Sequence, residues 1–152
     1  MSEDALLCDT GAILDYLVEI APDHDAFRDA IDGARTRYVP GLVLAEVDYF
    51  LRGERKAMTA LIGDLRRGAF TYAAPTLSLL ERAMAIDRQY ADLRLGLVDA
   101  SIVALADEVG VYRVATRDVR HFSAVKTRRG RRFELVVRPV RPDPGRRSRP
   151  RR

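Results

Sequence analysis

Short apolar segments alternate along this chain with longer segments in which apolar residues recur every three or four positions. The short segments predict strands over 6–8, 37–39, 70–74, 111–115 and 133–137. The longer segments predict helices over 11–18, 22–33, 42–52, 54–67, 76–90 and 98–109. Because strands that alternate with helices pair in parallel through right-handed crossovers, we expect an α/β fold whose mostly parallel central sheet is covered by helices on both faces.

The length and composition fit a single domain of this kind. A chain of 152 residues with 47% hydrophobic content can bury a substantial core. Its one cysteine, Cys8, cannot form an internal disulfide, which favours a reducing compartment. No apolar stretch approaches the ~18 to 20 residues of a membrane helix, and the acidic start at 1–4 is unlike a basic secretory leader. We therefore expect a soluble cytoplasmic protein without a membrane partner.

The net charge of +4 is unevenly distributed. Residues 126–152 hold twelve basic residues and two acids, so this end is strongly positive and the rest of the chain is negative. We place the domain at 1–140 and a basic, disordered tail at 141–152, where Arg146 and Arg147 are candidates for RNA contact. A basic tail that only increases solubility has the same composition, and this alternative stays open.

Two carboxylates fall on the apolar faces of predicted helices. On a helical wheel the neighbours of Glu46 are Leu42, Val43, Tyr49 and Phe50. Asp99 lies in line with Ile102, Val103 and Ala106, with Ser101 on the far side. Since an unpaired buried carboxylate costs several kcal/mol, each of the two acids needs a partner or a cation.

Two further acids follow predicted strands. Asp9 comes directly after the first strand, and Asp118 comes three residues after the strand that ends at Ala115. Both belong at the carboxyl edge of a parallel sheet, where ligands bind in this fold class. If the helical acids face the same edge, four carboxylates converge and a divalent cation must compensate them. Because His24 and His121 look isolated, an oxygen-only ligand set favours Mg²⁺ or Mn²⁺ over zinc.

Each of these acids also has a structural interpretation when it is taken alone. Asp9 and Asp118 could satisfy backbone amides in turns, Asp99 could favour the first turn of its helix, and Glu46 could pair with a buried arginine. Thr10 and Thr116 each neighbour an acid at a strand end. Their hydroxyls could hold the carboxylates in place or merely cap helices. The coincidence of all four acids favours a functional site.

The residues around these acids resemble a known family. The segments that carry the resemblance are Leu6-Leu7-Cys8-Asp9-Thr10, Leu44-Ala45-Glu46-Val47, Leu95-Gly96-Leu97-Val98-Asp99-Ala100-Ser101, Ala115-Thr116-Arg117-Asp118 and His121-Phe122-Ser123. In order and spacing they resemble the motifs of PIN-domain ribonucleases, and most closely the VapC toxins of bacterial VapBC toxin-antitoxin pairs. The resemblance covers residues 4–137 and implies a three-layer α/β/α fold.

The resemblance also implies an activity and a set of site residues. Asp9, Glu46, Asp99 and Asp118 match the acidic quartet that binds Mg²⁺, with Mn²⁺ able to substitute, and that supports RNA phosphodiester hydrolysis. Asp92 matches a further acid that often precedes the third motif. Arg117 departs from the family pattern, which usually has an apolar residue there, and we expect it to contact RNA.

The implied partners are an RNA substrate, a cognate antitoxin and a second copy of the chain. An antitoxin would lay an amphipathic segment into an apolar groove formed by the helices at 11–18 and 42–67 and reach the acids with a basic side chain. Water attack without a nucleophilic side chain would leave 5′-phosphate and 3′-hydroxyl ends. The scarcity of histidine favours this route over attack by the 2′-hydroxyl of the RNA itself.

Three other functions compete with this interpretation. The segment Asp9-Thr10-Gly11 resembles an aspartic protease motif, but the helix-periodic segments that follow argue against that nearly all-strand fold. A phosphoryl-transfer enzyme with Asp9 as nucleophile would usually carry a second aspartate where this chain has Gly11. A non-catalytic module that binds RNA or a protein partner is the alternative from a different class, although the presence of all four acids disfavours it.

Overall fold

A five-stranded parallel sheet forms the centre of the protein, as a computed structural model that describes residues 4–140 shows. Its strands are β1 (Ala5–Cys8), β2 (Thr36–Pro40), β3 (Thr71–Ala73), β4 (Arg113–Ala115) and β5 (Glu134–Leu135). The strand order is β3-β2-β1-β4-β5. The chain therefore adds β2 and β3 on one side of β1 and then adds β4 and β5 on the other side. The order reverses between β1 and β4, and the crevice at such a reversal is where ligands bind in open α/β sheets.

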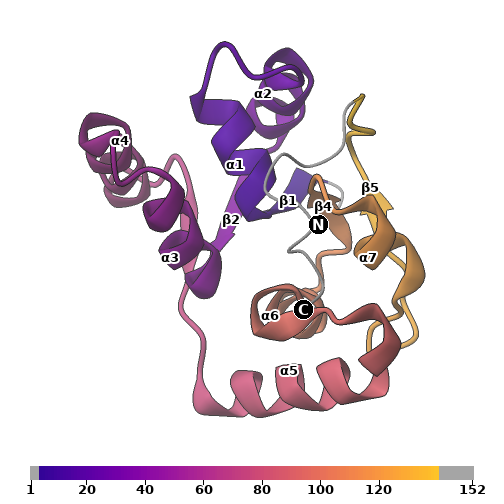
Figure 1. Cartoon of the computed structure of the whole chain (residues 1–152). Coiled ribbons are helices and arrows are strands. Elements are labelled where there is room, and N and C mark those ends of the chain that lie inside the picture. The colour runs from indigo at the N-terminus through magenta and orange to yellow at the C-terminus, as the bar shows by residue number, and fades with distance from the viewer. Residues whose placement is uncertain (1–3, 141–152) are drawn as a thin grey trace, which may run out of the picture.

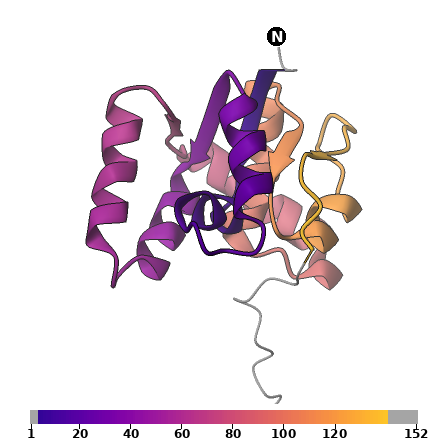
Figure 2. The same ribbon diagram turned by 90° about the horizontal axis from the view of Figure 1, so that it is seen from above.

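Helices cover both faces of this sheet. The α-helices are α1 (Thr10–Leu17), α2 (His24–Gly33), α3 (Gly41–Phe50), α4 (Arg55–Arg66), α5 (Leu77–Gln89), α6 (Gly96–Val109) and α7 (Val119–Ala124). Figure 1 shows α1 and α2 on one face of the sheet and α6, backed by α5, on the other. Viewed from above, α3 and α4 lie at one end of the molecule and α7 and β5 lie at the other (Figure 2). The expected three-layer α/β/α architecture is confirmed, with α5 packed outside α6.

Burial explains why β1 and α6 are central. Leu6, Leu7 and Cys8 are fully buried, as expected for a middle strand covered on both faces. Ser101 is also buried, although the helical wheel places it opposite the apolar stripe of α6. Because α5 covers the side of α6 that the stripe leaves free, α6 is enclosed on both sides and a small polar residue fits there. Gly110 ends α6 in the left-handed conformation, with φ of 68°.

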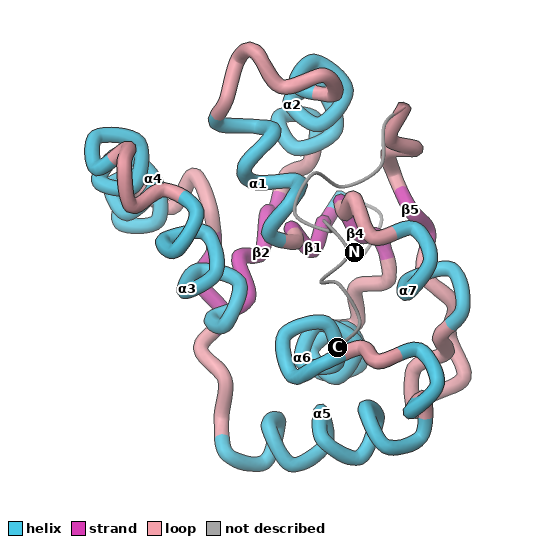
Figure 3. Tube along the Cα trace, in the orientation of Figure 1, coloured by secondary structure: helices cyan, strands magenta, loops and turns pink. Residues whose placement is uncertain are grey.

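The predicted elements are mostly correct in type and less so in length (Figure 3). Thr76 caps α5 as its position suggests, accepting a hydrogen bond from the Leu79 amide at 3.1 Å. The predicted strands 111–115 and 133–137 shorten to three and two residues. Helix α7 was not predicted, since six residues are too few to show a helical period. Within the described part of the chain, no helix combines the length and apolar character that a membrane span requires.

Candidate active site

The crevice at the carboxyl ends of β1 and β4 brings the four predicted acids together. Asp9 follows β1 and caps α1, while Asp118 follows β4 and caps α7. Glu46 comes from the middle of α3 and Asp99 from the first turn of α6. All four line one cavity of about 540 Å³. Four chain segments that are distant in sequence therefore contribute one acid each to the same crevice.

Threonine hydroxyls hold two of these acids. The Thr116 hydroxyl donates to Asp9 Oδ2 at 2.6 Å, and the Thr10 amide donates to Asp9 Oδ1 at 2.7 Å. The Thr10 hydroxyl donates to Glu46 Oε1 at 2.6 Å. Both threonines are buried, so these bonds fix the carboxylates in the cavity wall. One oxygen of Glu46 is thereby oriented by α1, although Glu46 itself belongs to α3.

The helical face around Glu46 differs from the predicted apolar stripe. Val43 and Val47 are buried, but Tyr49 and Phe50 are exposed, with 59% and 52% of their surface accessible. Glu46 is half-buried between these two groups and faces the cavity. The apolar pattern of α3 therefore combines a core face with an aromatic rim beside the site.

Burial and like charge disfavour ionisation in the crevice. Burial of the Asp9 carboxyl, reinforced by the nearby Asp99 and Glu46 charges, raises its pKa from 3.8 to about 8 even though Thr116 and Thr10 donate to it. Burial is also the main cause that raises the pKa of Asp99, and the Asp118 charge adds to it. The carboxylates alone cannot all carry their charge at neutral pH, so the crevice favours a compensating cation.

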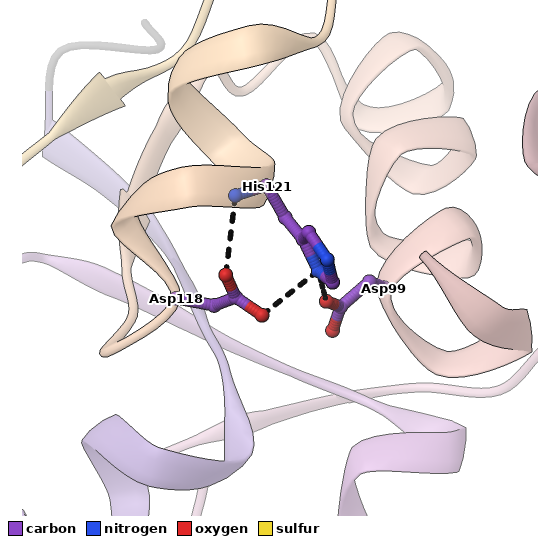
Figure 4. A group of neighbouring side chains, drawn as sticks. All are labelled: Asp99, Asp118 and His121. Carbon is purple, nitrogen blue, oxygen red and sulfur yellow. Dashed lines mark hydrogen bonds and ion pairs between the residues drawn. The ribbon is translucent and has the colours of Figure 1, made fainter. Parts of the chain in front are cut away.

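A histidine already lies between two of the acids (Figure 4). His121 Nδ1 is 2.6 Å from Asp99 Oδ2 and 2.8 Å from Asp118 Oδ2. Its Nε2 is 2.9 Å from the carbonyl oxygen of Leu93, which can only accept, so Nε2 carries a hydrogen. A proton must then also lie on the contact between Nδ1 and the carboxylates, because bare lone pairs would repel at these distances.

The expectation that His121 is isolated is therefore wrong. Asp118 caps α7 by accepting from the His121 amide at 3.1 Å, and this first turn brings the imidazole back to the acid. The spacing Asp118-x-x-His121 was the available signal, but it is informative only once a helix is known to begin at Asp118. His24 lies elsewhere, on α2, where its Nδ1 bonds the carbonyl of Asp15 at 2.8 Å.

Comparisons with known proteins bear on this site. Residues 6–127 match the family model of the PIN domain. The chain belongs to the PIN-domain family. It is 36% identical over 134 residues to ribonuclease VapC26 of Mycobacterium tuberculosis, covering 86% of this chain and 99% of that protein. This relative places the chain among the VapC-type PIN domains.

Two solved structures share the fold. The sarcin-ricin loop cleaving toxin VapC20 of Mycobacterium tuberculosis superposes with a TM-score of 0.65 at 18% identity, covering 72% of this chain and 86% of that one. A toxin-antitoxin complex from Klebsiella pneumoniae gives a TM-score of 0.64 at 19% identity, covering 79% of this chain and 92% of that one. At these identities, the likeness concerns the arrangement of helices and strands in the PIN domain.

The donor set of this PIN domain fits a divalent metal ion. Asp99, Asp118 and His121 offer three ligand atoms within 4.8 Å of one another, and Asp9 and Glu46 line the same cavity. Carboxylate oxygens are the ligands that Mg²⁺ and Mn²⁺ prefer. A cation here would compensate the Asp99 and Glu46 charges, which add to burial in raising the Asp9 pKa.

Arg117 does not have the exposed position that RNA contact requires. Its guanidinium is buried and forms ion pairs with Asp15 and, at 2.8 Å, with Asp23. Its aliphatic stem packs on Gly11, where an added Cβ would come within 2.9 Å of Arg117 Cγ. The expectation of a surface arginine is therefore corrected: Arg117 joins the end of β4 to α1 and to the loop before α2.

The remaining predicted residues lie outside the cluster of acids. Asp92 is exposed on a short 3₁₀ helix, Ala91–Leu93, and is not among the residues that line the cavity. Arg146, Arg147 and the rest of the predicted tail at 141–152 lie outside the described residues.

Two residues of the cavity wall were missed. Arg94 lines the cavity and has a left-handed backbone, with φ of 51° and ψ of 53°, which costs about 1–2 kcal/mol for a residue other than glycine. Its exposed guanidinium forms no ion pair with any described residue, despite the acids around it. Phe50 lines the same cavity and is half exposed. An isolated arginine in a loop carries no sequence signal of such a role.

Proposed function

We propose that this protein is a metal-dependent endoribonuclease and acts as the toxin of a type II toxin-antitoxin pair. The convergence of Asp9, Glu46, Asp99 and Asp118 on one cavity carries the proposal. Membership of the VapC-type PIN domains supports the choice of RNA over other phosphodiesters. An RNA substrate and a reducing cytoplasm, where RNA and a free Cys8 thiol both persist, fit this activity.

The metal is Mg²⁺ in this proposal, with Mn²⁺ able to replace it. Asp9, Glu46, Asp99 and Asp118 would hold the ion, with His121 as a neighbour that orients the last two. When bound, it would neutralise the charge that develops at phosphorus and make water a better nucleophile at neutral pH.

The side chains then have distinct tasks. Thr10 and Thr116 orient Glu46 and Asp9, so that the negative charge points into the cavity. A carboxylate of the quartet accepts the proton of the attacking water while the new bond between oxygen and phosphorus forms. The bond from phosphorus to the 3′ oxygen breaks and that oxygen takes up a proton. The products carry a 5′-phosphate and a 3′-hydroxyl.

Arg94 and Phe50 are placed to bind the substrate next to the cleaved bond. Arg94 is a cation at the cavity wall without an acidic partner among the described residues, which suits a phosphate neighbouring the scissile one. The exposed ring of Phe50 offers a stacking surface for an unpaired base. We expect Arg94→Gly to raise KM for RNA several-fold and to increase stability slightly, because glycine relieves the left-handed strain. Arg94→Ala should raise KM equally without the gain in stability.

An antitoxin and a second copy of the chain are the proposed protein partners. The acidic crevice would accept a basic side chain from an antitoxin segment, which would block the metal-binding acids. The homodimer stays a prediction from the family resemblance. Light scattering of the purified chain, alone and with its antitoxin, measures both assemblies.

The decisive experiment is the cleavage of total cellular RNA by antitoxin-free protein with Mg²⁺, with Mn²⁺ and with EDTA. The Asp99→Asn variant is assayed in parallel, and the ends of the products are mapped. We expect discrete metal-dependent cuts with 5′-phosphate ends that the variant does not make. Absence of cleavage by folded, partner-free protein with either metal would favour the non-catalytic binding module.

A further inference from the structure

The chain forms a basic turn at 126–132, just before β5. Lys126 and Arg132 form an isolated antiparallel bridge that closes the turn. Inside it, the Thr127 amide donates to the Arg131 carbonyl and the Gly130 amide to the Thr127 carbonyl, both at 2.8 Å. Gly130 has a φ of 76°, which permits the tight reversal. The backbone of this turn is therefore fixed by its own hydrogen bonds.

Contacts with the rest of the fold hold the turn in place. The Arg129 amide donates to the buried Asp107 carboxylate of α6 at 3.0 Å, and the Tyr112 hydroxyl donates to the same carboxylate at 2.9 Å. Tyr90 accepts from the Lys126 amide at 3.0 Å. The guanidinium of Arg131 lies 4.3 Å from the centre of the Tyr112 ring. The backbone that carries the side chains of the turn is therefore held rigidly against the rest of the fold.

Five of the seven residues of the turn are cations, and all five are exposed: Lys126, Arg128, Arg129, Arg131 and Arg132. Within the described residues, none of the five forms an ion pair. The nearby acids are already engaged, since Glu108 pairs with Arg82 and Glu134 pairs with Arg113. The turn is therefore an uncompensated patch of positive charge, which attracts polyanions.

A cavity adjoins this patch. It has a volume of about 600 Å³ and lies between α5, α6 and the turn. Arg82, Arg128 and Arg129 line it together with apolar side chains of the two helices, among them Ile86 and Ala104. Two acids also line it: Asp107, which accepts from the Arg129 amide, and Glu108, which pairs with Arg82. An apolar floor beside arginines suits an unstacked base whose phosphates contact the cations.

The patch lies at the edge of the sheet opposite the acids. The turn precedes β5, at the amino ends of the parallel strands, whereas Asp9 and Asp118 follow the carboxyl ends of β1 and β4. Along α6, Asp99 and Asp107 are separated by about 12 Å at 1.5 Å per residue. A ligand that reaches both sites must span more than that distance, so a folded RNA can do so and a single phosphodiester cannot.

We propose that the turn at 126–132, with its adjoining cavity, is a second binding surface for the phosphate backbone of a folded RNA, away from the cleaved bond. The proposal rests on the proposed ribonuclease function, which supplies the polyanion. The surface raises affinity for RNAs large enough to reach it and leaves the chemistry at the acids unchanged. It thereby selects substrates by shape.

The test compares two double variants that remove the same charge. Arg128→Gln with Arg132→Gln alters the turn but spares the backbone anchor at Arg129 and the stacked Arg131. Lys56→Gln with Arg66→Gln alters two exposed cations of α4 that form no ion pair with described residues. Fluorescence anisotropy with a folded RNA of about 30 nucleotides in EDTA gives Kd as a function of salt, and thermal melting checks that both variants fold.

We expect the turn variant to bind about tenfold more weakly and its salt slope to fall by one to two, since each lost phosphate contact contributes about 0.7 to 0.9. The α4 variant should stay within about twofold of the parent. With Mn²⁺, the turn variant should show a raised KM for the folded RNA and an unchanged rate on bis(p-nitrophenyl) phosphate, which is too small to reach the turn.

Equal affinity and equal salt slope for the two double variants would overturn the proposal. Polyglutamate that binds the parent but not the turn variant, with RNA affinity equal in both, would overturn it in favour of an acidic protein partner. Failure of the parent to cleave RNA with any metal concerns the ribonuclease function, and that assay is independent of the binding comparison.

Discussion

Two groups of buried or half-buried aspartates lie close together in this protein and differ in the basic side chain that contacts them. In the crevice, Asp9 and Asp99 face Glu46 and Asp118, and the His121 imidazole contacts Asp99 and Asp118. In the second group, Asp15 and Asp23 share the guanidinium of Arg117.

This difference distinguishes buried charges that have a functional role from buried charges that have a structural role. Arg117 contacts both Asp15 and Asp23, so it holds α1, the loop before α2 and the end of β4 together. In the crevice, burial together with the nearby Asp99 and Glu46 charges raises the Asp9 pKa to about 8. A group of acids whose charges raise one another's pKa can bind a cation, whereas carboxylates that already contact a buried guanidinium contribute to stability.

The largest expected effect is on catalysis. Asp99→Asn or Glu46→Gln should reduce RNA cleavage more than 100-fold, because each removes a proposed metal ligand. Neither should lower the melting temperature in EDTA, and a rise is expected because like-charge repulsion is relieved. A large loss of stability with retained cleavage would show that these residues, like Arg117, have a structural role.

Arg117→Met should have the opposite profile. It leaves Asp15 and Asp23 buried without their cation, which costs about 3–5 kcal/mol of unfolding free energy. Urea denaturation measures this loss. The triple variant with Asp15→Asn and Asp23→Asn is the matched control, and it should recover most of the stability. A single variant as stable as the parent would show that the ion pairs are dispensable.

His121→Asn tests whether the His121 imidazole supports the acids of the crevice. Loss of the imidazole removes the group that orients Asp99 and Asp118, so cleavage should fall about 10- to 100-fold. The apparent affinity for Mn²⁺, measured by calorimetry, should weaken with it. An unchanged Mn²⁺ affinity would indicate that His121 acts on something other than the metal site.

The smallest effect concerns pH in the absence of metal. Because the folded pKa of Asp9 is raised, the folded state retains a proton that the unfolded state loses near pH 4. The stabilising contribution is full below that pH and is lost as pH rises through about 8. Melting temperatures in EDTA should therefore decline from pH 5 to 9, and Asp9→Asn should flatten the decline. Identical slopes would mean that Asp9 is ionised throughout.

The sequence reveals the parts of the site that depend on topology. Asp9 and Asp118 are predictable because each follows a strand of a parallel sheet, and the carboxyl ends of such strands share one edge. Glu46 and Asp99 are recognisable as acids on otherwise apolar helical faces. The sheet and all helices except α7 and the short 3₁₀ turn follow from the periodicity of apolar residues.

Contacts between segments that are distant in sequence cannot be predicted from strand ends or from the periodicity of apolar residues. The pairing of Arg117 was not predicted, because nothing in its own segment indicates Asp15 or Asp23 as partners. This pairing depends on how α1 and the loop before α2 pack. His121 looked isolated because α7 is too short to have a visible period. The left-handed backbone of Arg94 has no local signal, since glycine is the usual residue there.

The central claim is that the crevice is completed by a divalent cation that displaces a proton. Calorimetric titration of the folded, antitoxin-free protein with Mn²⁺ at pH 7, in two buffers of different ionisation enthalpy, tests it directly. We predict binding accompanied by release of about one proton, with both lost in Asp99→Asn. Absence of Mn²⁺ binding, or equal binding by the variant, would contradict the claim.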